Sequence, residues 1–96
     1  MKVDVATFKV RPYFEPDGPV AWIAVAHHES DGETWATIGA AEKEAAAFFD
    51  LTDQLPPEAV PTFVQNEVGT EELCAKLLWS AKSRAMQQGT PIVQVP

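Results

Sequence analysis

The stretch "VAWIAVAHHESDGETWATIG", residues 20–39, contains two strand-like runs separated by a turn signal. The first run, residues 20–28, is apolar on both faces, which is typical of a strand buried on two sides or of one whose second face meets a partner. The second run, residues 33–39, is rich in β-branched and aromatic residues. Asp31-Gly32 favours a tight turn between them, because glycine adopts a positive φ at no steric cost. The stretch therefore predicts a β-hairpin.

The residues before this hairpin predict another strand and a loop. Residues 2–11 alternate as a strand should, but the apolar phase changes near Ala6. This change indicates either a bulge or a strand covered on both sides. Residues 12–19 contain three prolines and an Asp-Gly pair, which favour a loop. We expect Tyr13 and Phe14 in this loop to be tucked against the core.

Helical periodicity follows the hairpin in two segments. Residues 40–55 carry an apolar stripe, and Pro56-Pro57 ends the predicted helix. Residues 71–88 form the second predicted helix, with Thr70 as N-cap and Gly89 as the C′ residue.

The remaining segments complete the predicted topology. Residues 56–69 are expected to be a connector with a short turn at residues 58–60, and residues 91–95 an extended segment that could pair with a sheet edge. The order is β-β-β-α-α-β, with the last strand open. We therefore expect one α+β domain over residues 1–96, a small antiparallel sheet with two helices packed on one face.

Composition restricts the class of protein. The chain has 96 residues, of which 46% are apolar and 22% charged, an ordinary globular balance. No apolar run approaches the roughly 20 residues that span a bilayer, and the first residues lack the apolar segment of a signal peptide. Cys74 is the only cysteine, which suits a reducing compartment. These features predict a cytoplasmic protein without membrane association.

Charge is distributed unevenly along the chain. The net charge is −7, but residues 12–75 carry 13 acids and one base, whereas residues 1–11 have a net charge of +2 and residues 76–96 of +3. An acidic field repels nucleic acid, so direct nucleic-acid binding is not expected. A protein partner is expected, and a nucleic-acid-binding protein or complex is one candidate.

The hairpin also contains the residues closest to a metal or catalytic cluster, which are His27, His28, Glu29, Asp31 and Glu33. A transition-metal site needs three or four ligands that converge on one point. Neighbouring residues on a strand point to opposite faces, so the adjacent histidines do not share a metal easily. We expect a hydrated turn with no metal and no cofactor. A small metal-dependent or acid–base enzyme that uses this hairpin is the alternative.

No nucleophile has a plausible base in the sequence. Cys74 lies on the apolar stripe of the second predicted helix, where a buried thiol is inert. The chain has no nucleophile elbow, phosphate loop or dinucleotide fingerprint. We expect no catalytic residue and a non-enzymatic protein.

The second predicted helix has apolar residues away from its core stripe. Trp79 and Met86 lie there, with Ala75 beside them and Lys82 close by. A helix that is apolar on two faces is either sandwiched or presents one face to a partner. Either Trp79 packs under the connector or the last strand, or it forms an interface, where tryptophan and methionine are favoured.

An acidic surface is the second candidate for partner binding. Its expected members are Glu29, Asp31 and Glu33 at the hairpin and Glu42, Asp50 and Asp53 on the first helix. Such a surface could occupy a basic groove meant for nucleic acid, or it could only keep a small protein in solution.

Residues 38–49, "IGAAEKEAAAFF", lead from a strand into a helix and resemble the amino-terminal part of HicB-type antitoxins over less than half of the chain. The size and acidity are also similar to those of small phage-encoded inhibitors of bacterial defence complexes, including anti-CRISPR proteins. We therefore expect an acidic protein-binding module that regulates or inhibits a partner, with an antitoxin or the hairpin enzyme as alternatives. A homodimer formed by the Trp79 face or the last strand remains open.

Overall fold

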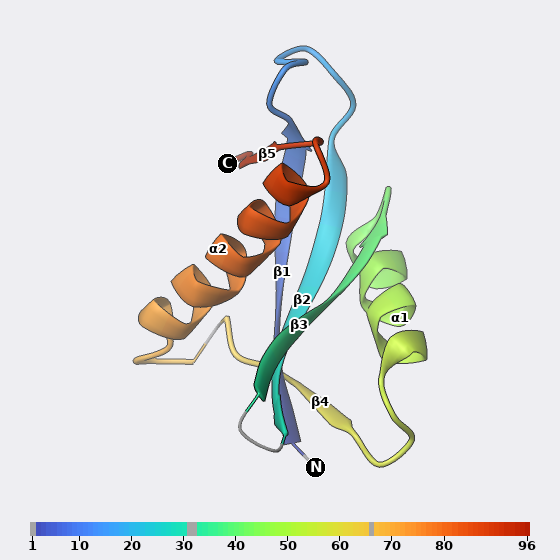
Figure 1. Ribbon diagram of the computed structural model, residues 1–96, viewed down its shortest axis with the longest axis vertical. Helices are drawn as coiled ribbons and strands as arrows, with labels where there is room; N and C mark the ends of the chain where they lie inside the picture. Colours follow the sequence, from blue (N-terminus) through green and yellow to red (C-terminus); the bar gives the residue numbers. More distant parts are fainter. Residues whose placement is uncertain (1, 31–32, 66) are drawn as a thin grey trace.

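The computed structural model describes residues 2–30, 33–65 and 67–96. It contains a mixed five-stranded sheet and two helices (Figure 1). The elements in chain order are β1 Lys2–Pro12, β2 Ala21–Ser30, β3 Glu33–Ala41, α1 Glu44–Gln54, β4 Val60–Phe63, α2 Glu71–Gln87 and β5 Ile92–Gln94. The predicted α+β class is confirmed.

Strands β1, β2 and β3 form an antiparallel meander. The predicted hairpin is confirmed, because β2 and β3 pair from Trp22↔Ala41 to Ser30↔Glu33. The turn residues of that hairpin, 31 and 32, lie outside the described residues. β1 pairs with the other side of β2, so β2 is an interior strand, as its apolar run indicated.

The second edge of β1 is covered by two short strands and one side chain. β4 runs parallel to the start of β1, and β5 runs antiparallel to its end. Between them the side-chain amide of Gln65 accepts a hydrogen bond from the Thr7 N–H at 2.8 Å and donates one to the Thr7 carbonyl. This amide therefore continues the ladder where neither strand reaches. The predicted extended segment near the carboxyl end is confirmed as β5.

β4 corrects the prediction of an irregular connector over residues 56–69. Its four residues contain Pro61, which argues against an interior strand but is tolerated at the edge of a sheet. A segment this short has no readable alternation, and its partner strand lies at the opposite end of the sequence.

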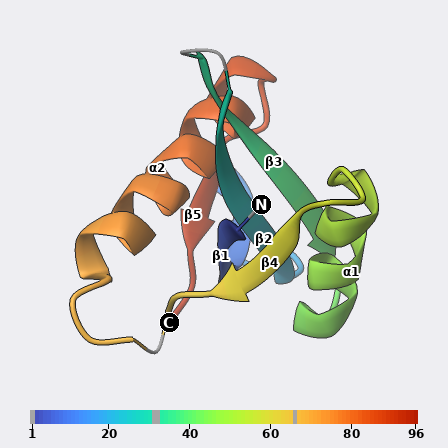
Figure 2. The same cartoon turned by 90° about the horizontal axis from the view of Figure 1, so that it is seen from below.

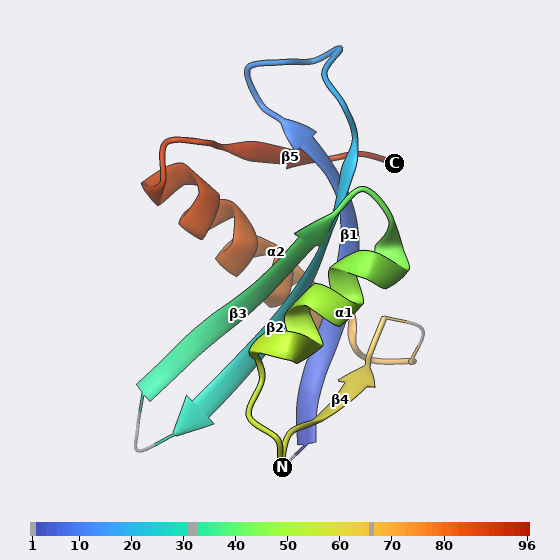
Figure 3. The same ribbon diagram turned by 90° about the vertical axis from the view of Figure 1, so that its right-hand side faces the viewer.

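The helices cover opposite faces of the sheet, so the prediction that both pack on one face was wrong (Figures 1 and 3). Figure 2 shows the strands between α2 on the left and α1 on the right. The physical reason is that β1 and β2 carry apolar side chains on both faces, and each face requires a cover. The phase change near Ala6 reflects this two-sided burial.

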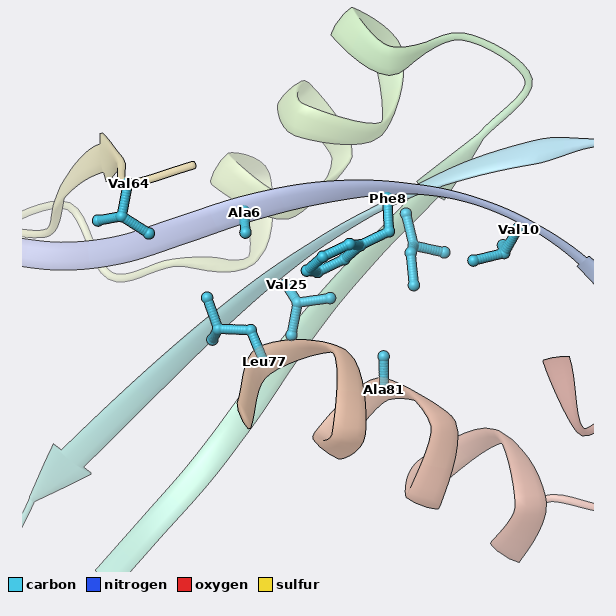
Figure 4. Packing of buried hydrophobic residues seen from close by; sticks show 8 residues of the cluster. Ala6, Phe8, Val10, Val25, Val64, Leu77 and Ala81 are labelled. Carbon is cyan, nitrogen blue, oxygen red and sulfur yellow. The ribbon is translucent and has the colours of Figure 1, made fainter. Parts of the chain in front are cut away.

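Each face has its own hydrophobic core. Under α2 the buried side chains are Ala6, Phe8, Val10, Ile23, Val25, Val64, Leu77 and Ala81 (Figure 4). Under α1 they are Val3, Val5, Ala24, Ala26, Ala47 and Leu51.

α1 begins at Glu44 and not at residue 40, because β3 continues through Ala41. The helix then returns along β3 at very short range. A Cβ atom built on Gly39 would lie 2.4 Å from both the carbonyl oxygen of Ala47 and the backbone nitrogen of Leu51. The absence of a side chain at residue 39 is therefore what lets α1 dock.

The ends of α2 agree with the sequence in position. Thr70 occupies the N-cap, but its hydroxyl makes no capping bond and lies 2.8 Å from the Glu67 carbonyl oxygen, inside the preceding turn. Gly89 follows the helix with φ +78°, which is the left-handed C′ conformation predicted for it. Across the described ranges, neither helix has the length and apolar character to cross a bilayer.

Candidate functional site

The outward side of α2 carries two large apolar side chains. Trp79 and Met86 are each 69% exposed. They are seven positions apart, close to two helical turns, and so share one stripe of the helix. Leu77 and Ala81 on the opposite side are buried against the sheet. The exposure excludes the alternative in which Trp79 packs under the connector or the last strand.

The loop between β1 and β2 adds two more exposed rings. Tyr13 is 59% exposed and Phe14 76%, so the expectation that they are tucked against the core was wrong. Their centroids are 5.1 Å apart in an edge-to-face arrangement. The Tyr13 N–H donates to the Pro91 carbonyl oxygen at 2.9 Å, which ties the loop to the segment after α2. The Arg11 guanidinium donates to the Pro16 carbonyl and closes the loop.

These features meet in an apolar groove of about 320 Å³, which we call the α2 groove. It is lined by Tyr13, Phe14, Lys82, Met86, Pro91 and Ile92. The loop, the helix and the segment around β5 therefore converge at one end of the molecule (Figure 1). Of the predicted partner-binding residues, the structure brings Met86 and Lys82 together here, and Trp79 continues the same stripe. Ala75 is exposed one turn earlier on α2.

A second hollow, also of about 320 Å³, lies between the carboxyl-terminal half of α2 and the sheet. Its lining consists of Ile23, Ile38, Ala40, Ala81, Arg84, Ala85, Gln88, Thr90 and Ile92. We call it the inner hollow. Ile92 lines both spaces, so they adjoin at β5.

The acidic residues predicted to form one surface have different roles. The Asp50 carboxylate accepts a hydrogen bond from the Ala40 N–H at 3.0 Å, and the Gln54 amide donates to the Ile38 carbonyl at 3.0 Å. Both backbone groups belong to β3, an edge strand, and would otherwise lack a partner in the ladder. The Asp50 carboxylate therefore stabilises the edge of β3 by accepting a hydrogen bond from its backbone.

The other predicted acidic residues are not seen to form one patch. Glu42 is exposed two residues before α1 and so does not lie on the helix as predicted, whereas Asp53 is exposed near the carboxyl end of α1. In the hairpin the backbone of Glu29 pairs with Thr34 and that of Glu33 with Ser30. The side chains of Glu29 and Glu33 lie outside the described residues, as does Asp31. The acidic surface therefore stays a prediction.

The two histidines point to opposite faces of β2, as expected for neighbours on a strand. The Nε2 atom of His28 lies 3.1 Å from the Thr37 hydroxyl oxygen within the sheet. Burial, and secondarily the nearby His27, lowers the pKa of His28 below its usual 6.5. Among the side chains that the structure describes, which do not include those of Glu29, Asp31 and Glu33, no group of three or more could hold a metal ion.

His27 makes a contact that the sequence did not reveal. Its Nε2 atom lies 2.6 Å from the Ser80 hydroxyl oxygen on α2, 53 residues away. A serine beside an imidazole is the first requirement of a nucleophile–base pair, but catalysis also needs a group that orients the base and donors for an oxyanion. Ser80 lies inside a helix, where its N–H is committed to the helical ladder. The bond therefore links β2 to α2.

No protein-family model, curated protein or solved structure matches this chain. The function has to be inferred from the geometry of the chain alone. The resemblances to HicB-type antitoxins and to phage inhibitors stay predictions.

Proposed function

We propose that this protein is a non-enzymatic binding module that regulates or inhibits a partner protein by docking through the outer side of α2. The observation that supports the proposal is the exposure of Trp79 and Met86, both 69%, next to the α2 groove. A HicB-type antitoxin and an inhibitor of a bacterial defence complex would both act in this general way, by occupying another protein.

The chemistry of this face suits protein recognition. Tryptophan and tyrosine dominate the energetics of many interfaces, and methionine adapts to the shape of a partner. Trp79, Tyr13, Phe14 and Met86 contribute nothing to either buried core. Large apolar side chains that are exposed together on a small protein are typical of an interaction site.

The face is also held in place before any partner arrives. α2 is packed on the sheet through Leu77 and Ala81, and the loop is tied to Pro91 by the Tyr13 N–H. A preorganised surface loses less conformational entropy on binding, so more of the contact energy becomes affinity.

The test is affinity purification of the wild-type protein from its native cellular background at low and then at high salt, followed by binding measurements with the partner. We expect Trp79→Ala to weaken binding by at least about 2 kcal/mol, as a buried aromatic anchor does. The matched control is Phe49→Ala, since Phe49 is 64% exposed on α1 but lines neither hollow. A partner that binds both variants as tightly as wild type would contradict the proposal.

Self-association through the same face is a different outcome of this test. A molecular mass that rises with concentration in wild type but not in Trp79→Ala would assign the face to a homodimer. A constant monomer mass would remove that possibility.

A further inference from the structure

We infer that the docking face of α2 recognises a protein segment in which large apolar side chains are combined with carboxylates. The inference rests on the proposed function, because it specifies the partner of that same face. It is carried by the charge around the two hollows, which is opposite in sign to that of the whole chain.

The chain has 14 acidic and seven basic side chains, yet residues 76–96 contain three bases and no acid. Two of those bases line the hollows: Lys82 lies in the α2 groove and Arg84 in the inner hollow. Neither of the two linings contains an acidic side chain. The acids of α2, Glu71 and Glu72, are confined to its first turn, at the other end of the helix.

Lys82 and Arg84 form no ion pair with the described part of the chain. Each instead lies beside apolar walls, made by Met86 and Ile92 around Lys82 and by Ile23 and Ile38 around Arg84. A carboxylate that binds against such a wall is partly removed from water, where a charge-assisted hydrogen bond is stronger than on an open surface. Arg84 can also offer the two parallel N–H donors that match a carboxylate.

The size of the hollows favours side-chain anchors. Each holds about 320 Å³, at the low end of the roughly 300–1,000 Å³ that small-molecule sites occupy. Because the two spaces adjoin at Ile92, a single segment passing over the end of α2 can fill both.

The long-range field of the protein makes the opposite prediction. A net charge of −7 attracts basic partners and repels acidic ones at a distance. If the acidic residues around α1 were the docking site, the preferred partner would be basic. The sign of the partner's charge therefore distinguishes docking at the local basic site on α2 from attraction to the overall negative charge of the chain.

The experiment uses two peptide-display libraries with the same apolar residues. Asp and Glu are the only charged residues of the first library, and Lys and Arg of the second. We expect the full-length protein to enrich peptides from the acidic library alone, with aromatic or aliphatic residues next to the carboxylates. Binding of a selected peptide should weaken as the salt concentration rises.

Variants then locate the contact. Lys82→Glu and Arg84→Glu are each expected to weaken a selected acidic peptide by at least about tenfold, because each removes a cation and leaves a like charge. Lys43→Glu makes the same change in net charge at an exposed residue before α1 and is the matched control. The control should change the affinity by no more than about twofold. Circular dichroism and thermal unfolding confirm that each variant is folded.

The outcomes separate this inference from the proposed function. Enrichment from the basic library, or peptides that lose binding in Trp79→Ala but tolerate both Lys82→Glu and Arg84→Glu, would overturn the inference and leave the docking face in place. Enriched peptides that bind Trp79→Ala and Met86→Glu as tightly as wild type would overturn both. If the acidic library enriches no peptide, the inference is overturned.

Discussion

The two helices pack on opposite faces of one sheet and each buries an alanine and a leucine, but their outward sides differ. On α1 the polar groups of Asp50 and Gln54 turn back to hydrogen-bond the backbone of β3. On α2 the large side chains of Trp79 and Met86 extend away from the rest of the chain. An acidic side chain on α1 therefore stabilises the fold by a hydrogen bond to the edge strand. The exposed apolar side chains of α2 belong to neither hydrophobic core and so are available for a partner.

The two helices also differ in how tightly they pack against the sheet. α1 approaches β3 so closely that residue 39 has no room for a Cβ atom. α2 leaves two hollows beside its carboxyl-terminal half. We therefore expect stability to be most sensitive on the α1 side and binding on the α2 side.

The largest effect should come from adding atoms to the α1 contact. Gly39→Ala places a methyl group 2.4 Å from backbone atoms of α1, which cannot move without displacing the helix. We expect a loss of about 3 kcal/mol or more in the free energy of unfolding, at the upper end of overpacking effects. Urea denaturation measures it.

The matched change on the other side is Ala85→Leu, which adds atoms next to the inner hollow. We expect this variant to stay within about 1 kcal/mol of wild type, because the space can accept the side chain. An equal loss of unfolding free energy in Gly39→Ala and Ala85→Leu would show that the two helices pack equally tightly, which would contradict the difference described above.

A smaller effect is expected from the edge of β3. Asp50→Ala leaves the Ala40 N–H without its acceptor and should cost about 1 kcal/mol of unfolding free energy. Asp53→Ala, at an exposed residue of the same helix with no hydrogen bond to β3, should change it by less than about 0.5 kcal/mol. If thermal unfolding gives equal changes in the free energy of unfolding for the two variants, the Asp50 carboxylate does not stabilise the edge of β3.

The buried His28, which lies on the α1 side of the sheet, should make the free energy of unfolding depend on pH. Since the folded state holds the pKa of His28 below its usual 6.5, the unfolded chain binds a proton at a higher pH than the folded chain does. Stability should therefore fall as the pH is lowered below 6.5, until the folded-state pKa is passed. The check is urea denaturation across this window, in which His28→Gln should have a flatter profile than wild type.

Ser80→Ala serves as its control, because it removes the contact of the other histidine with α2 and leaves His28 buried. Its pH profile should keep the slope of the wild type. If His28→Gln and wild type have the same slope, burial of His28 does not control the pH dependence.

The smallest expected change in stability belongs to the most exposed part of α2. Trp79→Ala removes a side chain that is 69% exposed and belongs to neither core. We expect the free energy of unfolding to change by less than about 0.5 kcal/mol. A cost above about 2 kcal/mol in urea denaturation would mean that Trp79 supports the fold, and the α2 face would lose its main argument.

Local elements were readable from the residues that form them. The apolar run of residues 20–28 and the β-branched and aromatic residues of 33–39, with Asp31-Gly32 between them, predicted the β2–β3 hairpin. Helical periodicity and Gly89 predicted α2 to within one residue at its end. Each of these signals lies within the element or directly beside it, so it can be read without knowledge of the rest of the chain.

The candidate site was predictable in part. The sequence placed Trp79 and Met86 off the core stripe but left open whether they were covered, and it gave no sign that Tyr13 and Phe14 would be exposed beside them. Exposure depends on whether a distant segment reaches a side chain. That information is absent from any short window of sequence.

Periodicity, turn chemistry and apolar content predicted β1, β2, β3 and the two helices, and gave cover on both faces of β1 and β2 as one of the alternatives. The face that each helix covers, the pairing of β4, the use of Asp50 at the β3 edge and the contact of His27 with Ser80 came from contacts between distant segments. The physical reason is that backbone propensity and side-chain alternation act over a few residues, whereas burial and hydrogen-bond partners are set by how the whole chain packs. The same packing leaves the α2 groove open.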